Sequence, residues 1–79
     1  MPKDVGLKRL FGQVLRELRT ERGLSQEELG FESDYHRTYI SQLERGQKNP
    51  SLKAIFRLAR VLGITPSEMI RRIESRVGE

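Results

Sequence analysis

The chain contains no cysteine and no tryptophan, and only one histidine among its 79 residues. Without cysteine it forms no disulfide frame and no thiolate metal site, and a single histidine provides no histidine pair for a metal. No apolar run approaches the ~18–20 residues that a membrane-spanning helix needs. The first residues lack the basic-then-apolar pattern of a secretory signal. We therefore expect a cytoplasmic protein without a metal and without a membrane anchor.

Motifs for catalysis are also lacking. The serine, histidine and aspartate residues form no nucleophile elbow, and no glycine-rich cofactor loop is present. Three acidic residues, Glu27, Glu28 and Glu32, are interpreted as a solvated helix face. We expect no enzymatic activity and no cofactor. With 79 residues there is also no room for a second, ligand-sensing domain, so no small-molecule ligand is expected.

What the chain does have is a small size and a basic charge. Residues 1–79 are expected to form one domain, near the lower limit for a self-sufficient core, with residues 1–6 and 78–79 frayed. The net charge is +4, and 11 arginines outnumber 4 lysines. Such a balance favours an anionic partner such as nucleic acid. A solvated surface that happens to be basic is the alternative.

The apolar residues recur at helical spacing in five segments, and no segment alternates as a strand would. Glycines at positions 23, 46 and 63 mark helix ends. Ser25 with Glu28, and Thr65 with Glu68, have the spacing of capping boxes. Ser51 is expected to cap the fourth helix. The sequence predicts an all-α bundle with helices at about 7–22, 26–33, 37–45, 52–62 and 66–77.

The second and third helices have the features of a helix-turn-helix, in which two short helices meet at a tight turn. Gly30 allows the two helices to approach closely; the alternative is that it ends the second helix early. Asp34 falls at the turn, and aspartate tolerates a left-handed backbone better than most residues.

The third helix carries a polar stripe opposite Ile40 and Leu43. Arginine can donate twice to guanine, and glutamine can pair with adenine, when a helix lies in the major groove. An ordinary solvated face would be richer in lysine and glutamate. The residues predicted to read bases are Arg37, Thr38, Ser41 and Gln42.

Around the stripe lie residues suited to hold the DNA backbone, because helix N-termini and basic loops attract phosphate. Each is equally suited to be a plain cap or a loop polar residue. Tyr39 either donates to phosphate or packs under the stripe. The predicted phosphate contacts are Gln26, His36, Tyr39, Arg45, Lys48, Asn49 and Ser51.

Three motifs occur in order: Leu-Arg-x-x-Arg-Gly-Leu-Ser-Gln-Glu-Glu-Leu at 18–29, Thr-Tyr-Ile-Ser-Gln-Leu-Glu-Arg-Gly at 38–46, and Asn-Pro-Ser-Leu followed by Leu-Ala-x-x-Leu-Gly-Ile at 49–64. With them the chain resembles the phage-repressor-like helix-turn-helix family (lambda repressor and Cro, the xenobiotic-response-element type), from about Leu10 to Ile73. The His-Arg-Thr-Tyr-Ile-Ser run at 36–41 is similar to restriction–modification controller proteins.

The resemblance implies a lambda-repressor-like bundle in which Arg37, Thr38 and Gln42 reach base edges. It also implies that Gln26 contacts phosphate and braces the recognition helix, and that Arg19 and Glu44 form a structural ion pair between the first and third helices. The turn departs from the family pattern, which has alanine, glycine and a small aliphatic residue where this chain has Gly30, Asp34 and Tyr35. Phe31 stands at a position expected to be polar, where it contacts DNA, a partner, or only its neighbours.

These features together predict a sequence-specific regulator of transcription that binds double-stranded DNA as a homodimer on a roughly palindromic operator. An antitoxin-like module, which binds a partner protein and its own promoter, is the alternative. Residues from the C-terminal half are expected to form the dimer interface unless they simply complete the core: Val61, Ile64, Ile70, Ile73 and Val77.

Overall fold

The computed structural model describes residues 5–78 and contains five helices within that range. Their bounds are α1 Val5–Glu21, α2 Gln26–Ser33, α3 Arg37–Glu44, α4 Leu52–Leu62 and α5 Pro66–Val77. The predicted all-α, five-helix fold is confirmed, and the third helix ends one residue earlier than expected, with Arg45 as its C-cap.

Val5 and Gly6 form the start of α1. Fraying of the chain ends stays a prediction. Gly78 is the C-cap of α5. The other positions of that expectation, 1–4 and 79, lie outside the described residues.

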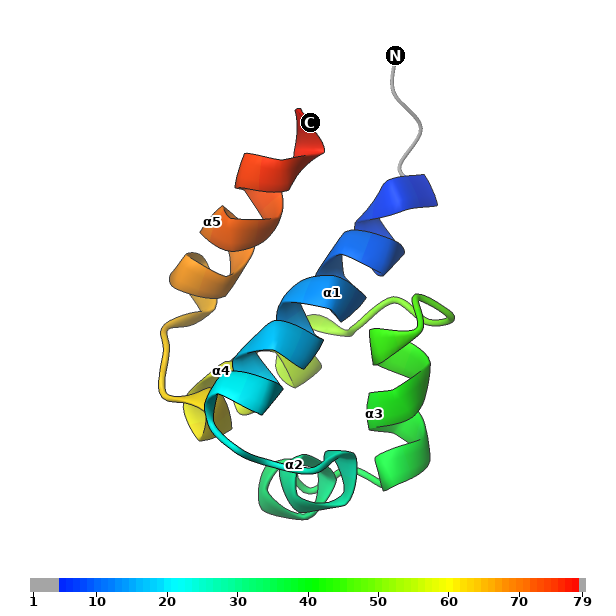
Figure 1. The fold of residues 1–79 in the computed structure, drawn as a ribbon, viewed down its shortest axis with the longest axis vertical. Coiled ribbons are helices and arrows are strands. Elements are labelled where there is room, and N and C mark those ends of the chain that lie inside the picture. Colours follow the sequence, from blue (N-terminus) through cyan, green and yellow to red (C-terminus); the bar gives the residue numbers. More distant parts are fainter. Residues whose placement is uncertain (1–4, 79) are drawn as a thin grey trace.

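The helices are arranged around α1, which lies between α5 and α3 (Figure 1). α1 and α5 run side by side in opposite directions, so that the start of α1 lies near the end of α5 (Figure 1). α2 packs against both α3 and α4. Within residues 5–78, no helix is long and apolar enough to cross a membrane.

A single apolar core receives side chains from all five helices. Three apolar residues of α1 and α4 lie outside this core and are exposed: Leu7 by 45%, Leu52 by 72% and Phe56 by 57%. The buried apolar residues are Phe11, Val14, Leu15, Leu18, Leu29, Ile40, Leu43, Ala54, Leu58, Ala59, Leu62, Met69 and Ile73.

Both capping boxes predicted from the sequence are present. The Ser25 hydroxyl accepts from the Glu28 amide at 2.9 Å, and the Glu28 carboxylate accepts from the Ser25 amide at 2.8 Å. Thr65 and Glu68 make the same reciprocal pair at the start of α5. These caps satisfy amides that the first turn of a helix leaves without partners.

Gly12 sets how closely α1 approaches α3. A Cβ atom at this position would lie 2.4 Å from the Leu43 carbonyl oxygen and 2.6 Å from that of Glu44. Because both contacts are with backbone, α3 would have to move to accept a side chain. This glycine therefore fixes the position of the predicted recognition helix, a role that helical periodicity did not reveal.

Candidate nucleic-acid interface

The turn between α2 and α3 is built from a glycine inside the helix and a left-handed residue after it. A Cβ on Gly30 would lie 2.5 Å from the Tyr35 carbonyl oxygen, so Gly30 provides close packing. α2 continues beyond it to Ser33, and early termination at Gly30 is therefore wrong. Asp34 has φ 65° and ψ 40°, the left-handed conformation expected for this position.

The outer face of α3 and the start of α2 enclose a polar hollow of 270 Å³. It contains three predicted base readers and two predicted phosphate contacts, brought together from separate helices. Gln42, the fourth predicted base reader, is half-buried and does not line the hollow. The lining residues are Gln26, Arg37, Thr38, Ser41 and Arg45.

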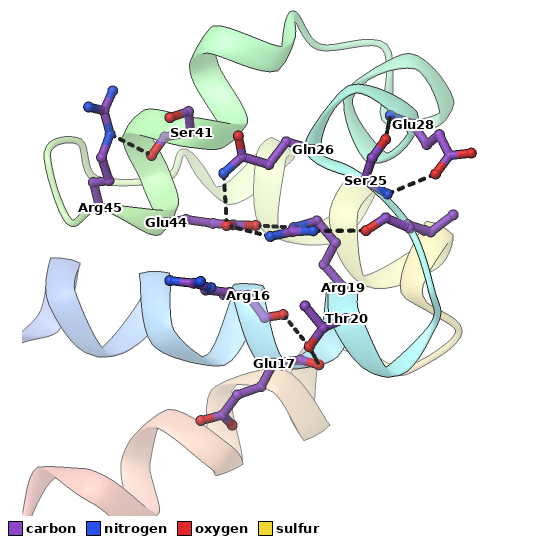
Figure 2. A network of polar contacts seen from close by, with 11 residues as sticks. Arg16, Glu17, Arg19, Thr20, Ser25, Gln26, Glu28, Ser41, Glu44 and Arg45 are labelled. Atoms are coloured by element: carbon purple, nitrogen blue, oxygen red, sulfur yellow. Dashed lines mark hydrogen bonds and ion pairs between the residues drawn. The ribbon is translucent and has the colours of Figure 1, made fainter.

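Behind this hollow lies a network centred on Glu44 (Figure 2). Arg19 donates from Nε to Oε2 of Glu44 at 2.6 Å and from Nη2 to Oε1 at 3.0 Å. Its Nη1 donates to the Leu24 carbonyl oxygen at 2.8 Å. The pair implied by the family resemblance is thus present and bidentate, with one further bond to the loop before α2.

The pair is desolvated, since the Glu44 side chain is 3% exposed and that of Arg19 is 12% exposed. The hydrogen bonds to Glu44 raise the pKa of Arg19, and the attraction of the opposite charge adds to this, while burial acts in the other direction. The Glu44 carboxylate therefore favours the charged form of Arg19.

Gln26 is oriented by the same carboxylate. Its Nε2 donates to Oε1 of Glu44 at 3.0 Å, as Figure 2 shows. The second N–H and the amide oxygen of Gln26 make no hydrogen bond to a described residue. Gln26 lines the hollow together with Arg37 and Thr38. The bracing role that the resemblance implies for Gln26 thus has a structural basis in the ion pair.

The other residues predicted to contact phosphate differ in where they lie in the fold. The Nδ1 atom of His36 accepts from the Thr38 amide at 3.0 Å, and Ser51 Oγ accepts from the Ala54 amide at 3.0 Å, so both residues act as N-caps. Lys48 is exposed in the loop after α3. Asn49 lines an apolar groove near α1 and α5, away from the hollow of α2 and α3.

Aromatic residues near the turn differ in environment. The Tyr39 ring is half-buried against the core and lies 4.9 Å from the Tyr35 ring, centroid to centroid. Packing under the stripe is therefore observed for Tyr39. Phe31 is 86% exposed, and the three contacts predicted for it, with DNA, a partner or only its neighbours, stay open.

The five predicted dimer residues do not share one surface. Ile73 is 8% exposed and belongs to the core, and Val61 and Ile64 pack partly buried against that core. Ile70 and Val77 are 45% and 54% exposed. These two line a groove of 650 Å³ together with the buried Ile73 and with Leu7, Phe11 and Ile55.

Comparisons with known proteins agree with this architecture. Residues 15–69 match a helix-turn-helix family model. The control protein C.BamHI of Bacillus amyloliquefaciens is 47% identical over 62 residues, which cover 77% of this chain and 76% of that protein.

Solved structures give the same result. The restriction–modification controller protein C.AhdI of Aeromonas hydrophila has a TM-score of 0.76 and 53% identity, over 78% of this chain and 94% of that chain. Wild-type C.Esp1396I, also a restriction–modification controller protein, has a TM-score of 0.82 and 26% identity, over 92% and 94% of the two chains. The chain therefore belongs to the helix-turn-helix family of transcriptional regulators and is close, in sequence and in fold, to restriction–modification controller proteins.

Proposed function

We propose that this chain regulates transcription by reading double-stranded DNA with α3 in the major groove. The observation that carries the proposal is the polar hollow formed by Gln26 together with Arg37, Thr38, Ser41 and Arg45. An arginine and neutral polar groups on one helix face match the donor and acceptor pattern of base edges. Helix-turn-helix proteins place their second helix in this way.

Contacts to the DNA backbone frame the reading surface. Gln26 lies at the first position of α2, where free amides and the positive end of the helix dipole favour a phosphate oxygen. Lys48 lies exposed in the loop that follows α3. Such contacts set the register of the protein on DNA, and the residues between them read the sequence.

The chain acts as a homodimer in this proposal, because a single recognition helix covers only one half-site. The apolar groove beside Ile70 and Val77 is the surface that a second copy covers, and it replaces the five-residue interface expected from the sequence. Binding to two half-sites one turn of DNA apart requires the two recognition helices of such a dimer to lie ~34–36 Å from each other.

We further infer that the regulated genes belong to a restriction–modification system. The support is the similarity to C.AhdI, which is named a restriction–modification controller protein, and to C.BamHI, which is named a control protein. The operator is then expected beside a gene for a restriction enzyme. An operator found only beside unrelated genes would leave DNA binding intact and overturn this assignment.

Selection of bound fragments from a random DNA pool tests the proposal. At ~150 mM salt, where phosphate contacts alone bind weakly, the protein should enrich a palindrome with half-sites about one turn apart. If folded protein enriches no sequence, the proposal fails, and binding to a partner protein becomes the reading to pursue.

A further inference from the structure

A chain of three side chains connects α4 to the recognition helix through the turn. The Arg57 guanidinium carbon lies 5.2 Å from the centroid of the Tyr35 ring, over its face. The Tyr35 ring in turn lies 4.9 Å from the Tyr39 ring, with 44° between their planes. Both separations are in the range at which a cation and a ring, or two tilted rings, attract one another.

Arg57 makes this contact and no other polar one within residues 5–78. Its guanidinium has no hydrogen bond or ion pair to any described residue, although the side chain is half-buried. The Tyr35 ring is thus the partner that holds this cation in place, and the cation holds the ring.

The Tyr39 ring is fixed while its hydroxyl is free. The ring is half-buried against the core and against Tyr35. Its hydroxyl bonds to no other described residue, and no described buried side-chain polar atom lacks a partner. The hydroxyl therefore reaches solvent. It does so from the first turn of α3, two residues after Arg37.

We propose that Arg57 and Tyr35 are positioning residues that hold the Tyr39 ring so that its hydroxyl donates to a DNA backbone phosphate. The proposal rests on the DNA binding proposed above. Tyrosine is one of the side chains that proteins use for phosphate contacts. A ring that is already ordered loses less conformational entropy on binding than a free one.

The two alternatives left open for Tyr39 are then parts of one arrangement. The ring packs, and this packing aims the hydroxyl. Tyr35 stands where the family resemblance predicted a small aliphatic residue, which has no face for a guanidinium or a second ring. The device is therefore specific to chains with an aromatic residue at this turn position.

The first arm of the test observes the rings directly. The chain has two tyrosines and no tryptophan, so 3-fluorotyrosine labels these two rings alone. Tyr35→Phe and Tyr39→Phe variants assign the two fluorine signals. Arg57→Ala is expected to shift the Tyr35 signal and to broaden that of Tyr39. Arg60→Ala, which removes the same charge from the same helix, is expected to change neither signal.

The second arm measures affinity for the DNA site selected from the random pool. Arg57→Ala should weaken binding by about two- to tenfold, which corresponds to the cost of ordering one side chain on binding. Arg57→Lys should restore most of the affinity, because an ammonium group is also attracted to a ring face. Arg60→Ala should weaken binding less than Arg57→Ala. Thermal melts confirm that each variant is folded.

A double-mutant cycle isolates the path through Tyr39. Tyr39→Phe removes the hydroxyl and keeps the ring, so Arg57→Ala should have no further effect on affinity in that background. Equal losses for Arg57→Ala and Arg60→Ala, or an undiminished loss in the Tyr39→Phe background, overturn the positioning proposal alone. If the unaltered chain selects no DNA site, the proposed function is wrong, and the positioning proposal, which depends on DNA binding, is wrong as well.

Discussion

One carboxylate oxygen of Glu44 accepts hydrogen bonds from two other helices. Oε1 lies 3.0 Å from Nη2 of Arg19 and 3.0 Å from Nε2 of Gln26. Arg19 belongs to α1, Gln26 begins α2, and Glu44 ends α3. The recognition helix is thereby tied to both of its neighbours at a point that water scarcely reaches, since the Glu44 side chain is only 3% exposed.

Arg19→Ala is expected to destabilise the protein strongly, because it leaves the buried Glu44 carboxylate without its counter-charge. The expected loss in free energy of unfolding is ~3–5 kcal/mol, measured by urea denaturation. Arg16→Ala is the matched control, since Arg16 is exposed on the same helix and should change stability by less than ~0.5 kcal/mol. Similar values for the two variants would show that the pair contributes little.

Gly12→Ala is expected to destabilise by ~1–3 kcal/mol, the usual effect of overpacking. Its Cβ would meet backbone oxygen of Leu43 at 2.4 Å, so α3 must shift. Gly6→Ala, on the same helix, has no atom within 4 Å of the new Cβ and should be neutral or stabilising. Melting temperatures of the two variants compare them directly. A Gly12→Ala protein as stable as the original would mean that α1 and α3 separate at little energetic cost.

Arg37→Ala is expected to reduce affinity for the selected operator by ~1–3 kcal/mol and to relax the choice of base at one position. Lys48→Ala is the contrasting variant. It should weaken binding to all sequences alike and reduce the slope of log affinity against log salt by about one. Titrations with operator and random DNA at several salt concentrations separate the two effects. An unchanged operator-to-random ratio for Arg37→Ala would remove Arg37 from the base readers.

The free energy of unfolding at acid pH should depend on the ion pair between Glu17 of α1 and Arg76 of α5. A hydrogen bond from Arg76 lowers the pKa of Glu17 from its ordinary 4.5, and the attraction of the Arg76 and Arg72 charges acts in the same direction, while burial opposes it. A lowered folded-state pKa contributes stability above the ordinary value, and this is lost as the pH falls through the folded-state pKa. Because the Glu17 side chain is 45% exposed, the contribution is modest.

Glu17→Gln should therefore be less stable than the unaltered protein at about pH 7, and the difference should shrink by about pH 3, a range that spans the ordinary glutamate pKa. Urea denaturation at both pH values measures it. Glu32→Gln is the control, because Glu32 is exposed and forms no ion pair within residues 5–78. A Glu17→Gln difference that stays constant with pH would contradict the assignment.

Ile70→Glu is expected to give a folded monomer, because it places a charge in the groove that a second copy is proposed to cover. Ile70 is 45% exposed, so the core should tolerate the change. Phe31→Glu makes a comparable change on α2, at a residue that is 86% exposed, and should leave a dimer. Sedimentation equilibrium distinguishes the two. A dimeric Ile70→Glu protein would exclude this groove as the interface.

Much of the fold was readable from local sequence. The two capping boxes and the glycines after α1, α3 and α4 act within one helical turn, and the predicted helix ends are accordingly close to the observed ones. The stripe on α3 was equally local, since positions 37, 38 and 41 share one helical face. The Arg19–Glu44 pair spans 25 residues and came from family resemblance, because spacing along the chain does not reveal it.

Burial at the margins of the core was less predictable. Helical periodicity shows that a residue lies on the apolar face of its helix. It does not show whether a second helix covers that part of the face. Leu52 and Phe56 recur at helical spacing in α4 and are exposed, while Ile73, predicted either to form a dimer surface or to complete the core, is buried. Coverage depends on how α4 and α5 cross their neighbours, which no single helix specifies.

Local patterns in the chain determined that five helices form, where they begin and end, and which face of α3 is polar, because capping and periodicity depend on residues a few positions apart. The tertiary structure decided what meets across helices. Gly12 against Leu43, Gln26 against Glu44 and Arg57 against Tyr35 are contacts between elements distant in sequence. They arise only when the helices pack, since the free energy of burying the apolar faces together fixes their relative positions.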